Sequence, residues 1–116
     1  MKLRLQSFRC AVIGIILMLR TQVHARWHVL ATVMVIILGF VLKVGRNDWL
    51  ALIIAMAMVW TAEAINTAIE ITCDAITKDR MPLIGHAKDV AAGAVLIASI
   101  FAAIIGAVVL VPKFFT

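Results

Sequence analysis

Charge is nearly missing from long stretches of this 116-residue sequence. Charged residues make up 15% of the chain, hydrophobic residues make up 65%, and the mean hydropathy is +1.11. Soluble domains contain about 45–50% apolar residues. The composition therefore excludes an ordinary water-soluble fold and indicates that the lipid bilayer is the solvent. The length corresponds to a single domain, residues 1–116.

Cysteine and the common nucleotide motifs are also scarce or missing. Cys10 and Cys73 lie far apart without C-x-x-C spacing, so the pattern favours neither a zinc site nor a disulfide framework. The sequence has no internal repeat and no linker rich in Pro, Gly or Ser. It lacks G-x-x-x-x-G-K-[ST], the kinase loop motifs, G-x-S-x-G and H-E-x-x-H, so any nucleotide site is not a P-loop.

The positive charge gathers near the N-terminus, beside a hydrophobic segment. The net charge is +5, and five cations lie in the first 26 residues: Lys2, Arg4, Arg9, Arg20 and Arg26. Anionic lipid and membrane topology explain this cluster better than DNA does. We therefore predict a membrane partner and no nucleic-acid partner.

Three segments are apolar enough to cross a bilayer as helices, which predicts an all-α membrane protein. They are residues 27–43, 49–70 and 90–111, and the last has 22 residues without a charge. Small residues in this last span would let neighbouring helices approach closely. We expect a tight turn at 44–48 and a polar loop at 72–88.

The N-terminal segment 3–20 has an apolar run too short to cross the membrane alone. Such a run suits an amphipathic helix at the membrane surface or the core of a signal peptide. Val23-His24-Ala25 resembles a cleavage site, but Arg20 lies where signal peptides are usually uncharged. We predict a surface helix and keep the signal peptide as the alternative.

Positive charge also predicts the orientation of the chain. With three spans, the N-terminus and the 72–88 loop lie on one side, and that loop carries Lys78, Arg80 and Lys88. The positive-inside rule makes this side cytoplasmic.

Four polar residues interrupt the second span and its continuation: Glu63, Asn66, Glu70 and Asp74. Their offsets of 3, 7 and 11 residues place them on one helix face, spread over about 16 Å. Glu63 lies about 21 Å along the axis from Trp49, inside the membrane but near its cytoplasmic face. A carboxylate at mid-membrane costs about 2.5–3.5 kcal/mol, so Glu63 is a functional candidate.

The two glutamates suit different chemical roles. A desolvated carboxylate can act as a general base, and one at the aqueous edge can hold a divalent cation. Lys88 and Asp89 open the last span on the same side. There the ammonium of Lys88 could neutralise a phosphate group, and the carboxylate of Asp89 could accept a hydrogen bond from a ligand. In the alternative, Asp74 pairs with a cation, Lys88 anchors its helix at the interface and Asp89 caps that helix.

Two histidines, His24 and His28, are spaced four residues apart. They could bind a metal on one helix face, although histidines in such places more often lie at the membrane interface.

The motifs E-A-I-N-T-A-I-E at 63–70, with Asp74, and A-K-D-V-A-A-G-A-V-L-I-A at 87–98 resemble the small prokaryotic diacylglycerol kinase family. That family includes the undecaprenol kinases of Gram-positive bacteria, and the resemblance covers most of the chain. It implies a lipid kinase of the bacterial cytoplasmic membrane with its active site on the cytoplasmic side. It also implies ATP as donor, Mg²⁺ as cofactor, and a homotrimer whose protomers share active sites.

The resemblance also implies roles for individual residues. Glu63 would be the catalytic base, Glu70 the metal ligand, and Asn66 a positioning group. The resemblance predicts five residues that contact the nucleotide: Asn66, Glu70, Asp74, Lys88 and Asp89.

One position departs from the family pattern. Where the family often has a second metal-binding Glu, in a stretch like S-E-x-N-F-R-I-H, this chain has TQVHARWH at 21–28, with Gln22 in that place. Gln22 offers only a neutral oxygen to the metal. Arg4 and Arg9 are available near the N-terminus for nucleotide contacts.

The resemblance predicts ATP-dependent phosphorylation of a lipid primary hydroxyl, converting diacylglycerol to phosphatidic acid. Undecaprenol is the alternative acceptor, and A-K-D-V-A-A and the terminal V-P-K look somewhat more like the undecaprenol kinases. Two rival functions are a non-catalytic membrane adaptor and a small proton-coupled multidrug transporter.

Overall fold

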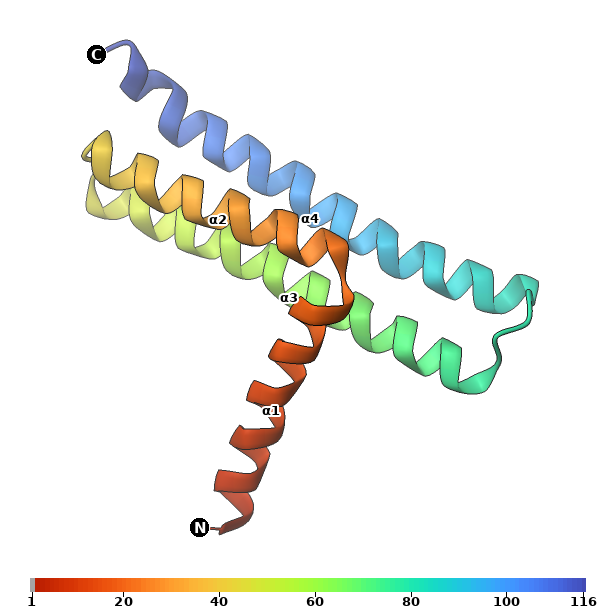
Figure 1. The fold of residues 1–116 in the computed structure, drawn as a ribbon. Coiled ribbons are helices and arrows are strands. Elements are labelled where there is room, and N and C mark those ends of the chain that lie inside the picture. The colour runs from red at the N-terminus through yellow and green to blue at the C-terminus, as the bar shows by residue number, and fades with distance from the viewer. Residues whose placement is uncertain (1) are drawn as a thin grey trace.

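The computed structural model describes residues 2–116, which form four α-helices joined by short connections. The helices are α1 (Lys2–Thr21), α2 (Val23–Val41), α3 (Arg46–Ile76) and α4 (Pro82–Phe114). Helices α3 and α4 run antiparallel and pack together most extensively, and α2 lies along the first half of α3 (Figure 1). Helix α1 leaves this bundle at a steep angle (Figure 1).

Helices α2, α3 and α4 are long and apolar enough to cross a membrane. This confirms the prediction of three candidate spans at the level of length and composition. Helix α3 has 31 residues and α4 has 33, which correspond to about 46 and 50 Å. Because the hydrocarbon core is about 30 Å thick, both helices are long enough to extend beyond it.

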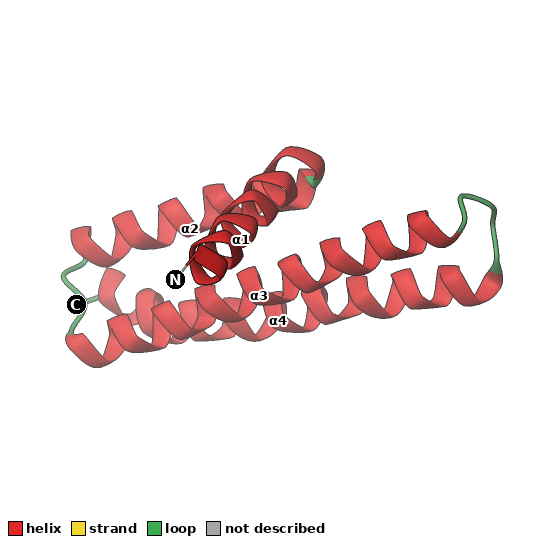
Figure 2. Ribbon diagram, turned by 90° about the horizontal axis from the view of Figure 1, so that it is seen from below, coloured by secondary structure: helices red, strands yellow, loops and turns green. Residues whose placement is uncertain are grey.

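The connection between α3 and α4 is shorter than the predicted loop at 72–88. It comprises residues 77–81, since α3 continues to Ile76 and α4 begins at Pro82 (Figure 2). Proline suits the first position of a helix because its missing N–H would be unpaired there in any case. Loss of hydrophobicity marks the end of the apolar span, but the helix itself continues into the polar residues on both sides.

The other helix bounds differ by a few residues from the prediction. Helix α2 begins at Val23 rather than residue 27, and α3 begins at Arg46, so the turn lies earlier than 44–48. Lys43 takes a left-handed backbone conformation in this turn, with φ of 54°, a conformation common just after a helix end. Gly45 is the N-cap of α3.

A single extended residue, Gln22, separates α1 from α2. The guanidinium of Arg26 donates to the carbonyl oxygens of Leu19 and Arg20, at 3.3 and 2.8 Å. These bonds satisfy carbonyl groups in the last turn of α1, which have no partner inside their own helix. The predicted N-terminal segment 3–20 is thus helical. Its place at the membrane surface stays a prediction.

The best-packed apolar core lies at the α2–α3 turn, away from residues 77–81. Val44, Leu52, Val109 and Leu110 are buried together there, and Trp49 packs against the cluster. Most other large apolar side chains of the isolated chain are exposed. In a membrane protein such surfaces face lipid or neighbouring protein, so their exposure agrees with the composition.

Candidate active site

The polar face of α3 passes from fully buried to open along its length. Glu63 has no exposed surface, whereas the side chains of Glu70 and Asp74 are 31% and 52% exposed. Asn66 lies between them, and its Oδ1 is buried. The predicted polar face, called the stripe from here on (Glu63, Asn66, Glu70 and Asp74), is therefore present, with its buried end in the bundle and its open end toward residues 77–81.

Glu63 is buried without adequate polar partners. Neither of its carboxylate oxygens has a hydrogen-bond partner among the described residues. The imidazole of His28 on α2 lies close to it, with Nε2 3.5 Å from Oε2 of Glu63. A buried charged group left unpaired costs several kcal/mol. A purely structural role does not explain this cost, so the position favours a functional group.

His28 lies against the candidate base, a position that the sequence interpretation did not predict. Its spacing from His24 suggested a metal pair or an interfacial position, but the structure points it at Glu63 instead. Among residues 2–116, no group of three His, Cys, Asp or Glu side chains is arranged to hold a metal ion. No sequence signal pairs His28 with Glu63, because the contact arises only when α2 packs on α3.

Lys88 joins α4 to the open end of the stripe. Its Nζ lies 2.7 Å from Oδ1 of Asp74 and 3.6 Å from Oε2 of Glu70. Lys88 precedes the uncharged run 90–111, and the hydrogen bond with Asp74 is the main cause that raises its pKa above the ordinary value. The ammonium is therefore charged at neutral pH, beside two carboxylates that could release it to a phosphate group.

The structure does not place Asp89 in the cluster that Lys88 forms with Asp74 and Glu70. Asp89 is exposed, and within residues 2–116 it forms no ion pair. It also does not cap the helix, because α4 begins at Pro82 with Met81 as its N-cap, two turns earlier. The capping alternative is therefore wrong. The contact of Asp89 with the nucleotide remains a prediction.

Oxygen donors suited to a hard divalent cation lie on the same face of α3. Asn66 offers a buried Oδ1 without a hydrogen-bond partner, and Glu70 follows it by one helical turn. Gln22 is half-buried at the N-cap of α2, where its side chain makes no capping bond. Carboxylate and amide oxygens are ligands that Mg²⁺ accepts, so the donor set fits that ion chemically.

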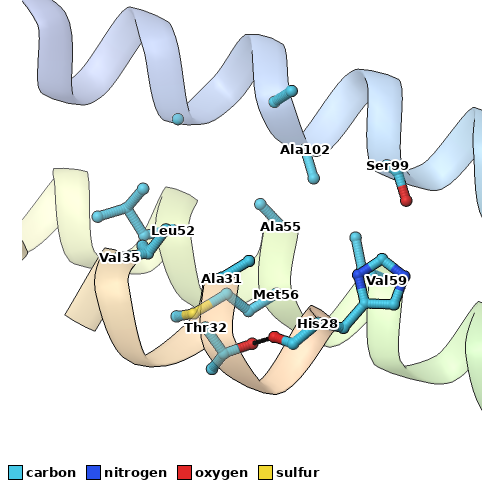
Figure 3. A pocket seen from close by; sticks show the side chains of 12 residues that line it. His28, Ala31, Thr32, Val35, Leu52, Ala55, Met56, Val59, Ser99 and Ala102 are labelled. Carbon is cyan, nitrogen blue, oxygen red and sulfur yellow. Dashed lines mark hydrogen bonds between the residues drawn. The ribbon is translucent and has the colours of Figure 1, made fainter. Parts of the chain in front are cut away.

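Two hollows lie at different levels of the bundle. One, of about 390 Å³, is lined by residues 77–82 together with Ile84, Gly85 and Lys88, and it brings the basic side chains Lys78 and Arg80 near Lys88. The other, of about 430 Å³, lies between α2, α3 and α4 and is almost entirely apolar. His28 and Val59 mark one end of this apolar cavity, and Leu52 and Val35 mark the other (Figure 3).

These features define a multi-pass membrane protein in which an apolar cavity, a buried acid and a cation-bearing polar end follow one another along α3. A cavity of this kind suits an apolar ligand, and the polar end suits an anionic one.

Sequence comparison gives the family. The profile described as "Prokaryotic diacylglycerol kinase" matches residues 9–110. The chain belongs to this prokaryotic diacylglycerol kinase family, whose members are lipid kinases. The assignment confirms the predicted enzyme class and supports it over the transporter alternative.

Three relatives illustrate the similarity. The chain is 36% identical over 108 residues to the undecaprenol kinase of Bacillus subtilis, covering 93% of this chain and 88% of that protein. It is 36% identical over 109 residues to a diacylglycerol kinase of Synechocystis, covering 93% of this chain but 62% of that longer protein. It is 32% identical over 85 residues to a diacylglycerol kinase of Pseudomonas aeruginosa, covering 73% of this chain and 69% of that protein.

Proposed function

We propose that the protein transfers the γ-phosphoryl group of ATP to the primary hydroxyl of a long-chain lipid at the cytoplasmic face of a bacterial membrane. The observation that carries this proposal is the buried, unpaired carboxylate of Glu63 between an apolar cavity and a polar, cation-bearing end. An apolar chain fits the cavity, and phosphates fit the polar end. Their reacting groups would meet near Glu63.

In the proposed reaction, the lipid hydroxyl oxygen attacks the γ-phosphorus and ADP leaves with the bridging oxygen. Glu63 accepts the hydroxyl proton, and this step needs a carboxylate oxygen that is free to accept it. Positioning and charge stabilisation supply most of the acceleration in phosphoryl transfer. Lys88 contributes a positive charge, and its ion pairs with Asp74 and Glu70 keep it at the polar end before ATP binds.

We assign the Mg²⁺ ligands to Glu70, with oxygen atoms of Asn66 and Gln22 as further candidates. When bound, Mg²⁺ would offset the negative charge of the β- and γ-phosphates. The remaining nucleotide contacts in this proposal come from Asp74, Lys88 and Asp89. Lys78 and Arg80 extend the cationic surface in the hollow beside them.

The acceptor has two candidates. Diacylglycerol, giving phosphatidic acid, is the acceptor named in two of the three relatives. Undecaprenol is favoured by the fuller match with the Bacillus subtilis undecaprenol kinase, of which this chain covers 88%. Both are primary alcohols on a long apolar body, which the apolar cavity can accommodate.

We also propose a homotrimer with shared active sites, in line with the small residues along α4 that permit close helix packing. Its N-terminal helix α1 would lie on the cytoplasmic membrane surface, where its cations meet anionic lipid.

Transfer of labelled phosphate from ATP to each lipid tests the function. Purified protein is supplied with Mg²⁺ and γ-labelled ATP in detergent micelles that contain dioleoylglycerol, undecaprenol or neither. We expect a labelled lipid product with at least one of the two alcohols. If neither alcohol is labelled while the helical fold is intact, the proposed function is wrong.

A further inference from the structure

We propose that His28 is a positioning residue for Glu63. In this inference, which rests on the proposed kinase function, the Nε2–H group of His28 holds one carboxylate oxygen so that the other faces the lipid hydroxyl.

The geometry of the pair is the first support. Nε2 of His28 lies 3.5 Å from Oε2 of Glu63, and Glu63 forms no other ion pair within residues 2–116. This distance exceeds a normal hydrogen bond of about 2.7–3.2 Å. Catalytic hydrogen bonds are often long in the free enzyme and shorten when substrate binds. A movement of roughly 0.5 Å would complete the bond.

The backbone of His28 is fixed to α3 by a short hydrogen-bonded chain. The indole Nε1 of Trp60 donates to Oγ1 of Thr32 at 2.9 Å. That hydroxyl donates in turn to the carbonyl oxygen of His28 at 2.7 Å, the bond dashed in Figure 3. Trp60 is one helical turn before Glu63, so the chain joins His28 to the same part of α3. The positions of His28 and Glu63 are thus set relative to each other.

The imidazole ring is also oriented by packing. It meets the ring of Trp60 edge to face, with centroids 6.3 Å apart and planes at 69°. Such contacts restrict the ring because aromatic pairs prefer this geometry. The ring also lies at one end of the apolar cavity (Figure 3). His28 is therefore placed between the site of the lipid body and the proposed base.

Glu63 needs such a partner because its orientation is otherwise unconstrained. The hydroxyl of Thr67 bonds the backbone oxygen of Glu63, not its carboxylate, and both carboxylate oxygens lack partners. A base that can turn away from the hydroxyl loses the advantage of proximity. One donor on Oε2 would leave Oε1 free to accept the proton.

Three substitutions at position 28 test whether His28 acts as a hydrogen-bond donor or only as a packing group. His28→Leu keeps bulk and removes the donor, whereas His28→Gln places an amide N–H near the position of Nε2. His28→Asn also carries an amide, but its shorter side chain does not reach Glu63. His86→Leu is the matched control, because His86 is exposed on α4 and does not line the hollow beside residues 77–81.

Kinetics in the two-lipid micelle assay give the first readout. We expect His28→Leu and His28→Asn to lower kcat roughly ten- to hundredfold, the scale of a lost hydrogen bond to a charged group. KM for ATP should stay near the wild-type value, because His28 does not line the hollow that contains Lys88. His28→Gln should recover most of kcat, and His86→Leu should behave as wild type. Equal activity of the Gln and Asn variants would overturn the proposal, even if the Leu variant fails to fold.

Infrared spectroscopy gives a second readout that needs no turnover. The absorption band of the Glu63 side chain is identified as the one lost in Glu63→Gln. We expect that band to shift in His28→Leu and His28→Asn and to return toward its wild-type frequency in His28→Gln. An unchanged band in the first two variants would contradict the contact.

Failure of this proposal is distinguishable from failure of the proposed function. If Glu63→Gln abolishes transfer but His28→Leu has wild-type kcat, only the role of His28 is wrong. If Glu63→Gln keeps its activity, the base assignment itself is wrong, whatever His28 does.

Discussion

Nζ of Lys88 lies 2.7 Å from Oδ1 of Asp74, a contact that ties the beginning of α4 to the end of α3 across the 77–81 connection. The two residues are 14 positions apart in sequence and meet because the two long helices run antiparallel. Lys88 also pairs with Glu70, so one cation forms ion pairs with two acidic residues of the stripe. This arrangement holds a positive charge where the phosphates of ATP are proposed to bind.

Replacing Lys88 by methionine tests the phosphate role of this cation. We expect KM for ATP to rise about tenfold or more, since hydrogen bonds between charged groups are among the strongest. Thermal stability should change little, because exposed ion pairs contribute little to the free energy of folding. Lys113→Met is the control, since Lys113 pairs with Asp48 at 3.9 Å at the other end of the bundle. Equal KM values for the two variants would contradict the role of Lys88.

The ion pair also predicts a pH effect with a definite sign. The hydrogen bond with Asp74 raises the pKa of Lys88 above its ordinary value of 10.5. The folded-state pKa therefore exceeds the unfolded one. The pair's stabilisation is present below pH 10.5 and is lost as the pH rises through the folded-state pKa. An NMR titration of labelled lysine should show the pKa of Lys88 falling in Asp74→Asn. An unchanged value would mean that the pair does not persist in solution.

Gly39 is predicted to be intolerant of any side chain. A Cβ at this position would overlap the six-membered ring of Trp49, which packs against the core at the α2–α3 turn. Gly39→Ala should therefore destabilise the protein by about 1–3 kcal/mol, the usual cost of overpacking. Gly14→Ala is the control, since a Cβ there would meet nothing within 4 Å. Thermal unfolding in detergent compares the two, and equal melting temperatures would argue against the packing of Trp49 on Gly39.

Gln22 gives a prediction about the metal requirement. Gln22 is one of the proposed Mg²⁺ ligands, so a carboxylate at this position would add negative charge to the proposed ligand set, and ligand charge is a main determinant of divalent-cation affinity. We expect Gln22→Glu to lower the Mg²⁺ concentration that gives half-maximal activity by several-fold. Asn47→Asp adds a charge at the opposite end of the bundle and should leave that concentration unchanged. If Gln22→Glu behaves like Asn47→Asp, Gln22 is not near the metal.

The features carried by a single helix were predictable from the sequence. Glu63, Asn66, Glu70 and Asp74 share one face because helix periodicity alone sets their directions. Three spans followed from the length and hydrophobicity of their segments. Helix ends were less predictable, since hydrophobicity marks the apolar span and not the polar turns that continue each helix, such as residues 82–89.

The features that depend on packing between helices could not be predicted. The contacts of His28 with Glu63 and of Trp60 with Thr32 join residues 35 and 28 positions apart, and they depend on how α2 lies on α3. Lys88 was expected on the same side as the stripe, and the structure adds that it contacts Asp74 and Glu70. Its neighbour Asp89 points elsewhere because adjacent residues on a helix lie about 100° apart.

Phosphoryl transfer by Glu63→Gln tests the central claim most directly. The substitution keeps the shape of the buried side chain but removes its ability to accept a proton, so the fold should persist while transfer falls about 10²- to 10⁴-fold. Labelled ATP with dioleoylglycerol and undecaprenol micelles gives the rate, and circular dichroism and gel filtration check the fold. The account predicts a folded, nearly inactive protein. A folded variant that phosphorylates lipid at close to the wild-type rate would contradict it.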